Sequence, residues 1–222
     1  MQWQLLESLP PAEAAQVLSA MGARSYPKGE VVFHEGDPAS VMHFVTSGLA
    51  QVSVHTEAGD TVAVDVVGRG AVFGELALIE DDAERAATVT ALQPLQTLTL
   101  TRQRFGVIRN RHPQVDRALI RLLAARLRQT DQRLLEALYS PVPQRVARRL
   151  TELCRLCTTE PGEPVLIPVT QETLAGMVGA TRTSTNQALR RLEALRLVEL
   201  ARGRVTVLDP TRLERRGAAR RA

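Results

Sequence analysis

The feature that most constrains this chain is a long segment near its middle that contains neither glycine nor proline. Between residues 114 and 139, one stripe of side chains recurs at spacings of four, four, three, four and four residues. This period predicts a single α-helix of about 25 residues, which is about 40 Å long. The stripe consists of Leu119, Leu123, Leu127, Thr130, Leu134 and Leu138.

A helix of this length carries more apolar surface than a small domain covers. We therefore expect the stripe to pack against a second copy of itself, as in a short parallel coiled coil. The alternative is that the stripe packs against the rest of its own chain. The segment predicts a dimerisation helix over residues 114–139.

The residues before this helix have the pattern of an all-β unit. From about residue 24 to residue 100, turn motifs such as PKGE, SGLA and EAGD separate short runs rich in β-branched residues. Turns at intervals of about 8 to 12 residues around short strands are typical of a small antiparallel roll or barrel. Strands are expected at Val31–Phe33, Met42–Val45, Val52–Val54 and Val62–Val67.

The residues after the long helix have the pattern of a winged helix-turn-helix. The motif SPVP ends the long helix because proline lacks a backbone donor, and Ser140 is expected to cap the next helix. Thr170 is expected to cap a short helix, Gly179 permits a tight turn, and Thr181 caps a second helix. Two short strands joined by ARGR then form a wing. The inner face of the second helix is expected to contain Ala188, Leu189, Leu192 and Leu195.

Together these segments predict an α+β chain with three parts. An antiparallel β-roll for effector sensing occupies residues 1–113, the dimerisation helix occupies residues 114–139, and the winged helix-turn-helix occupies residues 140–222. The last eleven residues, RLERRGAARRA, are expected to form a frayed basic tail rather than a structured motif.

Charge is distributed unevenly along the chain. Residues 1–140 contain 13 Lys and Arg against 16 Asp and Glu, a net charge of −3, whereas residues 141–222 contain 15 against 8, a net charge of +7. A basic C-terminal part is typical of a polyanion-binding domain joined to a domain with another task. All but one of the 28 cations are arginine, which favours bidentate contacts to phosphate and guanine. A GC-rich genome is the alternative explanation for this preference for arginine over lysine.

The second helix of a helix-turn-helix places its N-terminal part in the major groove of DNA. Arg182 is then positioned to bind guanine, and Asn186 or Gln187 to pair with adenine. The expected base-reading residues are Arg182, Thr183, Asn186 and Gln187. The expected phosphate contacts, which fix register without reading sequence, are Thr170, Thr181, Arg190, Arg202 and Arg204. The alternative is an ordinary helical hairpin with a solvated polar face.

The strongest signal in the β-rich part is the motif FGELALIEDDAERAATV. Gly74, Glu75 and, ten residues later, Arg85 place backbone N–H groups, a carboxylate and a guanidinium around one small ligand. The carboxylate accepts from ribose hydroxyls, and the guanidinium neutralises a phosphate. The nearby glycine spacing is one residue off the dinucleotide-binding fingerprint and lies in no βαβ unit, so we reject a Rossmann site.

This motif resembles the phosphate-binding cassette of cyclic-nucleotide-binding domains. With the helix-turn-helix downstream, the chain over about residues 5–208 resembles the CRP/FNR superfamily of bacterial transcription regulators. The resemblance implies a homodimer that binds a palindromic operator in double-stranded DNA and contacts RNA polymerase. It also implies cyclic AMP as an allosteric effector. A cassette that is only structural would instead give a ligand-independent regulator.

Carried over residue by residue, the family pattern implies that Glu75 binds the ribose 2′-hydroxyl and that Arg85 binds the cyclic phosphate. It places Gly74 and Leu76 against the sugar and phosphate, and Thr130 against the adenine. The N-terminal cysteine ligands of the family's iron–sulfur branch are absent, as are the features of its haem-binding members. Neither an iron–sulfur cluster nor haem is therefore expected.

Three features depart from the sequence pattern of the cyclic AMP-binding members of this family, two in the ligand site and one in the reading helix. The usual serine or threonine after the cassette arginine is Ala86, which keeps its backbone N–H but has no hydroxyl. The serine that follows the helix threonine is replaced by Asp131, which either accepts from an adenine amino group or repels an anionic ligand. The reading helix has Arg182, Thr183 and Gln187 where an Arg, Glu and Arg pattern is usual, so we expect a related but different palindrome.

Little else in the sequence suggests chemistry. Cys154 and Cys157 lie on one predicted helix, where two buried or half-buried free thiols are expected and a partial metal or redox site is the alternative. The four histidines are scattered without ligand spacing, so no metal is expected. An enzyme would be indicated by a paired acid and base or by a nucleophile with a histidine, and the sequence has neither. We therefore do not expect an enzyme. Without a signal peptide or an apolar run of spanning length, we expect a cytoplasmic protein.

Overall fold

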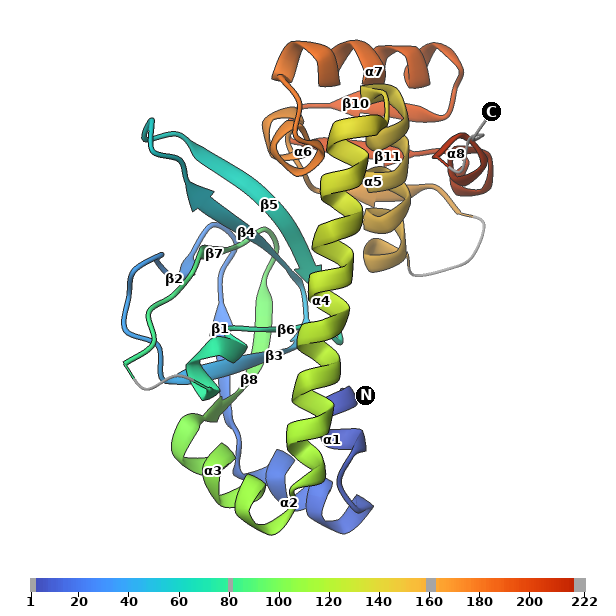
Figure 1. Ribbon diagram of the computed structural model, residues 1–222. Coiled ribbons are helices and arrows are strands. Elements are labelled where there is room, and N and C mark those ends of the chain that lie inside the picture. Colours follow the sequence, from blue (N-terminus) through green and yellow to red (C-terminus); the bar gives the residue numbers. More distant parts are fainter. Residues whose placement is uncertain (1–2, 80–81, 159–162, 218–222) are drawn as a thin grey trace. The chain divides into compact units, whose positions relative to one another are not determined.

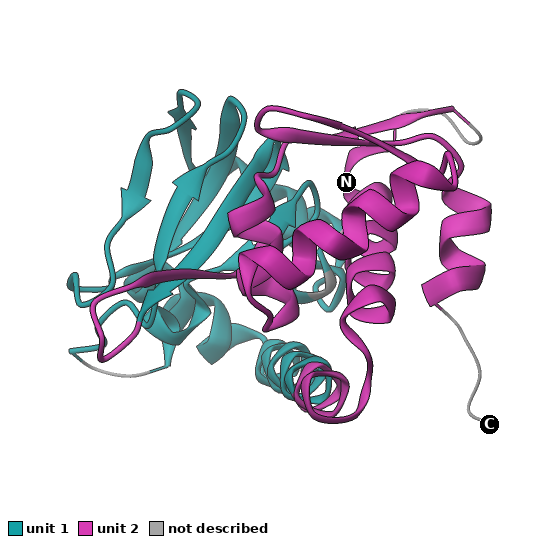
Figure 2. Cartoon of the chain, turned by 90° about the horizontal axis from the view of Figure 1, so that it is seen from above, with its two compact units in different colours: residues 1–55, 67–130 teal, residues 56–66, 131–222 magenta. Residues whose placement is uncertain are grey.

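The chain forms two compact units (Figure 2). The computed structural model describes residues 3–79, 82–158 and 163–217. Unit 1 comprises residues 1–55 and 67–130, and unit 2 comprises residues 56–66 and 131–222. Helix α4, Gln114–Tyr139, contributes residues to both units.

The β-rich part of the chain contains two four-stranded sheets, in the orders β1-β8-β3-β6 and β2-β7-β4-β5 (Figure 1). The pairs β1–β8, β3–β8 and β4–β7 are antiparallel, which confirms the predicted roll. Gly48 joins β3 to β4 with a φ of +83°, and a Cβ there would collide with the carbonyl of Pro94. The strands are β1 (Gly22–Tyr26), β2 (Val31–Phe33), β3 (Val41–Ser47), β4 (Leu49–His55), β5 (Thr61–Gly68), β6 (Val72–Phe73), β7 (Thr88–Ala91) and β8 (Leu95–Thr101).

A cluster of large apolar side chains joins the helices of unit 1 to its strands. The rings of Trp3 and Phe44 meet edge to face, with their centroids 5.4 Å apart. Phe105 of α3 and Val115 of α4 are buried in the same cluster. Each fully buried side chain of this size contributes about 1.5–3 kcal/mol, so the cluster fixes the start of α4 on the roll. The short helices of this unit are α1 (Gln4–Glu7), α2 (Pro11–Ala20), η1 (Glu75–Leu78) and α3 (Arg102–Arg111).

The exposed apolar stripe of α4 differs from the stripe predicted from the sequence. Leu119 is buried and Leu123 packs on the core of unit 1, whereas Leu127 is 63% exposed. At about 100° per residue the six predicted positions fall within about 100° of one another, so they share one broad face, and what differs along the helix is the burial of that face. Steps of seven residues stay within about 20° of one face. The exposed residues on this face, called the α4 stripe below, are Ile120, Leu127, Leu134 and Leu138, while Leu135 and Tyr139 are exposed farther around the helix.

Helix α4 therefore divides its apolar side chains between two tasks. Its first turns pack on their own chain, so this alternative to dimerisation holds for the start of the helix. Its α4 stripe stays exposed in the single chain. Among the described helices, none combines the length and the apolar character needed to cross a membrane.

The C-terminal part of unit 2 is a winged helix-turn-helix, as predicted. Thr170 caps α6 by accepting from the backbone N–H of Thr173, and Gly179 after α6 is left-handed. Thr181 caps α7 by accepting from the backbone N–H of Ser184. The wing strands β10 and β11 pair antiparallel, and β9 pairs with β11. The elements are α5 (Val142–Cys157), β9 (Val165–Ile167), α6 (Gln171–Val178), α7 (Arg182–Ala194), β10 (Val198–Ala201), β11 (Arg204–Val207) and α8 (Pro210–Gly217).

Two predictions about helix ends in this unit are wrong. Ser140 does not cap α5, because it lies one position before the residue that precedes this helix; its backbone N–H donates to the carbonyl oxygen of Glu136 at the end of α4. The residue that precedes α5 is Pro141, with no side-chain cap. Leu195 was expected on the inner face of α7, but it follows the last residue of the helix and is 38% exposed.

The prediction of a frayed tail is also wrong for the residues up to 217. The segment Pro210–Gly217 forms helix α8, because Asp209 accepts from the backbone N–H of Arg212 at 2.9 Å and starts the helix. Leu213 is fully buried and anchors α8 in unit 2. Residues 218–222 of the predicted tail lie outside the described residues.

The two cysteines lie on α5 as free thiols, Cys154 buried and Cys157 half-buried. Burial raises the pKa of Cys154 to about 12 and that of Cys157 to about 11. Both thiols are therefore protonated at neutral pH, and a thiol is a weaker nucleophile and ligand than a thiolate. Within the described residues, no group of three His, Cys, Asp or Glu side chains is arranged to hold a metal ion.

Candidate ligand site and nucleic-acid interface

The cassette residues come together where strand β6 ends. Gly74 follows β6 with a φ of +74° and precedes the η1 turn that carries Glu75. A Cβ at position 74 would collide with the guanidinium of Arg85, so only glycine lets the arginine approach this backbone. Glu75 and Arg85 are nearly buried, with 5% and 7% of their surfaces exposed. Residues 80 and 81 of the cassette lie outside the described residues.

The guanidinium of Arg85 is held on two sides. Nη1 donates to the carbonyl oxygen of Val41 at 2.9 Å, and Cζ lies 4.0 Å from the centre of the Phe33 ring. Burial lowers the pKa of Arg85, and the charge of Asp37 opposes that shift. The Nε atom is buried without a hydrogen-bond partner. Because arginine stays protonated in proteins, Arg85 offers a buried positive charge and an unused donor to an anion.

Glu75 provides a buried carboxylate with one paired and one unpaired oxygen. Its Oε1 accepts from Nη1 of Arg126 on α4, and Nη2 of Arg126 donates to the carbonyl oxygen of Val72 at 2.6 Å. Its Oε2 is buried without a partner. Arg126 was not expected in the site. The signal that could have identified it is its position one helical turn before Thr130.

The other predicted ligand residues are open to solvent in the single chain. These four residues, all exposed, are Leu76, Ala86, Thr130 and Asp131. The structure therefore brings together Gly74, Glu75 and Arg85 and adds Arg126 to them.

The unpaired atoms of this site determine which chemical groups would fit it. A buried donor or acceptor without a partner costs about 1–3 kcal/mol. A ligand that brings an anionic oxygen to Arg85 and a hydroxyl to Glu75 satisfies both groups. A phosphate joined to a sugar has this combination of groups.

A buried aromatic cluster lies next to Arg85. His43 stacks on Phe73 with 4.8 Å between ring centroids, and its Nδ1 lies 3.2 Å from Oγ1 of Thr97. The ring of Phe33, which also contacts Arg85, lies 5.8 Å from that of His43. Burial, and then the positive charge of Arg85, lower the pKa of His43 to about 3. The imidazole is therefore neutral at physiological pH.

We expect the free energy of unfolding to fall as the pH is lowered from about 6 towards about 4. Folded His43 stays neutral until about pH 3, whereas the unfolded side chain binds a proton near pH 6.5, at about its ordinary pKa. The unfolded state then carries one more proton, which removes up to about 1.4 kcal/mol of stability per pH unit. Denaturant unfolding at several pH values in this window measures the slope.

His43→Phe is the matched variant for this experiment. It keeps an aromatic ring in the cluster and removes the titrating group, so its stability should depend less on pH than that of the wild-type chain. The carboxylates titrate in both proteins, and only the difference between the two curves reports on His43. Parallel curves would show that His43 is not the source of the slope.

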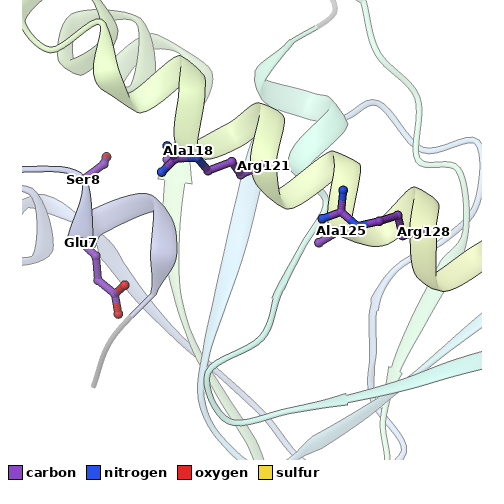
Figure 3. A pocket seen from close by; sticks show the side chains of 6 residues that line it. All are labelled: Glu7, Ser8, Ala118, Arg121, Ala125 and Arg128. Carbon is purple, nitrogen blue, oxygen red and sulfur yellow. The ribbon is translucent and has the colours of Figure 1, made fainter.

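A hollow in unit 1 lies between α1 and α4 and has a volume of about 500 Å³. Figure 3 shows Glu7 on α1 and two arginines on α4. Each arginine directly follows a residue of the α4 stripe in the sequence, which places it about 100° around the helix from that residue. Its lining residues are Glu7, Ser8, Ala118, Arg121, Ala125 and Arg128.

The predicted reading residues on α7 differ in exposure. Arg182, Thr183 and Gln187 are exposed, and Asn186 is half-buried. The Nε of Arg182 lies 3.8 Å from a carboxylate oxygen of Glu172, with both side chains at least 70% exposed. An exposed ion pair of this kind contributes little, so Arg182 is free to leave it.

The predicted phosphate contacts surround these residues. Thr170 and Thr181 are exposed at the starts of α6 and α7, where their hydroxyl oxygens cap the helices. Arg190 donates to Glu193 at 2.7 Å, and this bond lowers the pKa of the Glu193 carboxyl. A groove of about 440 Å³ joins the helix starts to the wing. Its polar lining includes Thr170, Gln171, Glu172, Arg182, Arg202 and Arg204.

The chain is similar to known regulators over almost its whole length. Residues 23–112 match the cyclic nucleotide-binding domain, and residues 144–216 match the Crp-like helix-turn-helix domain. The cyclic AMP receptor protein of Thermus thermophilus is 30% identical over 210 residues, which cover 95% of this chain and 94% of that protein. The CRP-like cAMP-activated global transcriptional regulator of Mycobacterium tuberculosis is 27% identical over 214 residues, covering 96% and 95%. The crystal structure of the Thermus thermophilus catabolite activator protein covers 97% of this chain and 98% of its own, with 29% identity and a TM-score of 0.55.

Proposed function

Because the chain belongs to the CRP/FNR superfamily of transcription regulators, we propose that it is a homodimeric regulator activated by cyclic AMP. In this proposal residues 1–113 sense the effector, residues 114–139 form the dimer, and residues 140–222 bind a palindromic operator in double-stranded DNA. The Mycobacterium tuberculosis relative is named as a transcriptional regulator, and we propose a regulatory rather than an enzymatic function for this chain. RNA polymerase is the proposed protein partner.

The observation that carries the ligand proposal is the pair of buried, unpartnered atoms on Arg85 and Glu75. Arg85 is proposed to neutralise the cyclic phosphate, with Nε as an additional donor. Oε2 of Glu75 is proposed to accept from the ribose 2′-hydroxyl while Oε1 stays with Arg126. A cyclic nucleotide supplies both groups from a rigid pair of fused rings, the cyclic phosphate and the ribose, so it orders little of its own structure on binding.

The exposed ligand residues have lesser proposed roles. Gly74 and Leu76 would lie along the sugar and phosphate, and Ala86 would offer its backbone N–H. Thr130 and Asp131 would face the base.

A second candidate function is a ligand-independent regulator whose roll serves as a scaffold for the dimer and for polymerase. It is favoured by Ala86, which has no hydroxyl for the phosphate, and by Asp131, which adds a negative charge to α4.

Calorimetric titration separates the two candidates. The purified protein is titrated with cyclic AMP and, separately, with cyclic GMP, and its affinity for a selected operator is measured with and without each nucleotide. Binding that tightens operator affinity supports the cyclic AMP switch. Absence of binding heat together with undiminished operator affinity supports the ligand-independent regulator.

The proposed DNA interface is the exposed start of α7 with the groove beside it. Arg182, Thr183 and Gln187 would read base edges in the major groove, and Asn186 would pair with adenine. The proposed phosphate contacts are Thr170, Thr181, Arg190, Arg202 and Arg204. In a dimer, two such helices enter successive major grooves about 34 Å apart.

Arg182→Ala is expected to weaken binding to the selected operator by about 1–3 kcal/mol, because a bidentate guanine contact is lost. The preference for one base pair in each half-site should be lost as well. Fluorescence anisotropy against operators with single base-pair changes measures both effects.

Arg191→Ala is the matched control, since Arg191 is exposed on the same helix and nine residues place it about 180° from Arg182. It removes the same charge and should leave base preference unchanged. Equal effects of the two variants would mean that Arg182 acts only through its charge.

A further inference from the structure

Asn186 and Gln171 form a hydrogen-bonded amide pair across the two helices of the helix-turn-helix. Nδ2 of Asn186, on α7, donates to Oε1 of Gln171, the first residue of α6, at 2.6 Å. The two residues are 15 positions apart in the chain, and both are half-buried. The orientation of the Asn186 amide is therefore fixed by a residue on another helix.

The other predicted reading residues are less constrained in the free protein. Thr183 and Gln187 are exposed. Arg182 has only its exposed pairing with Glu172 at 3.8 Å, which holds a side chain weakly. Asn186 thus differs from its neighbours in having a short, partly buried anchor.

The bond to Gln171 leaves a complete reading edge on Asn186. A primary amide has two N–H donors and a carbonyl oxygen, and Gln171 uses one of the two donors. The remaining N–H and Oδ1 are the donor and acceptor that pair with N7 and N6 of adenine in the major groove.

Gln171 also keeps groups for a contact of its own. It contributes only Oε1 to the pair, so both N–H donors of its Nε2 are left by this bond. Gln171 lines the same groove as the wing residues Arg202 and Arg204. Phosphate oxygens are the acceptors that such a groove would receive.

We propose that Gln171 is a positioning residue that determines specificity: it holds the Asn186 amide in the orientation that reads adenine, and it donates to a phosphate. This inference rests on the proposed function, because it requires α7 to lie in the major groove. Asn186 then binds without first losing the freedom of its side chain, so the preference for adenine depends on the anchor.

The test uses the full-length protein and an operator selected from random palindromic duplexes. Each half-site base pair is then changed in turn, and affinity is measured by fluorescence anisotropy at one salt concentration, with and without cyclic AMP. The proteins compared are wild type, Gln171→Leu, Gln171→Glu, Asn186→Ala and the double variant of Gln171→Leu with Asn186→Ala. Thermal unfolding confirms that each is folded, and Gln171→Ala replaces Gln171→Leu if the latter is not.

We expect Gln171→Leu and Asn186→Ala to lose preference at the same A·T pair, each by about 5-fold or more. The double variant should lose no more preference there than Asn186→Ala does alone. Gln171→Glu retains an acceptor for Asn186 but has no N–H for a phosphate. It should therefore keep the A·T preference while binding every duplex more weakly.

Two results would overturn the inference. The first is uniform weakening by Gln171→Leu with the A·T preference intact, which would make Gln171 only a backbone contact. The second is an Asn186→Ala profile identical to that of the wild type. Failure of the proposed function looks different, because the wild-type protein itself would then select no sequence.

Discussion

Arg85→Ala should weaken cyclic AMP binding by more than about 30-fold, measured by isothermal titration. The guanidinium is nearly buried and is the proposed partner of the cyclic phosphate. Removing one partner of a buried, hydrogen-bonded charge pair costs about 2 kcal/mol or more, which is about 30-fold in affinity. Operator binding by this variant should no longer respond to the nucleotide.

Arg69→Ala is the control for this loss. Arg69 is exposed on the turn before β6, so the substitution makes the same change in net charge without touching the site. Both variants should remain dimers by light scattering. Unchanged cyclic AMP binding by Arg85→Ala would show that the cassette is only structural and would favour the ligand-independent regulator.

Leu127→Asp should convert the protein from a dimer to a monomer. Leu127 is at the centre of the α4 stripe and is 63% exposed in the single chain, a position that a parallel helix pair would bury. Two carboxylates facing each other there would have to lose their water without a partner. Size-exclusion chromatography with light scattering should give the mass of one chain.

The same variant should bind the operator more than about 100-fold more weakly, because one chain cannot engage both half-sites together. Gln129→Asp is the matched control, since Gln129 is exposed on α4 and two residues place it about 200° from Leu127. It should remain a dimer with normal operator affinity. A dimer of Leu127→Asp would mean that the α4 stripe is not the interface.

Much of the fold could be predicted because its signals are local. Thr170 and Thr181 cap their helices through side chains only three residues from the bonded amides, and Gly179 has the positive φ that its turn requires. Such features depend on a few consecutive residues. The same holds for β2, β3, β4 and β5, which contain the four strands expected from the turn motifs, whereas β1, β6, β7 and β8 were not predicted individually.

The parts that could not be predicted depend on distant residues. Arg126 lies one helical turn before Thr130, but its ion pair is with Glu75, 51 positions away, and no spacing rule relates those two residues. The face of α4 that stays exposed depends on where the roll covers Leu119 and Leu123, which the helical period alone does not determine. Helix α8 likewise depends on a buried place for Leu213 that other elements provide.

The seven-residue spacing within the α4 stripe has a mechanical consequence. Ile120, Leu127 and Leu134 fall about 20° behind a straight line with each repeat, so two copies joined along them would wind around each other with a left-handed twist. Wound helices behave as a screw, because sliding one along the other also turns it. A small axial shift at one end of such a pair would therefore reach the other end as a rotation.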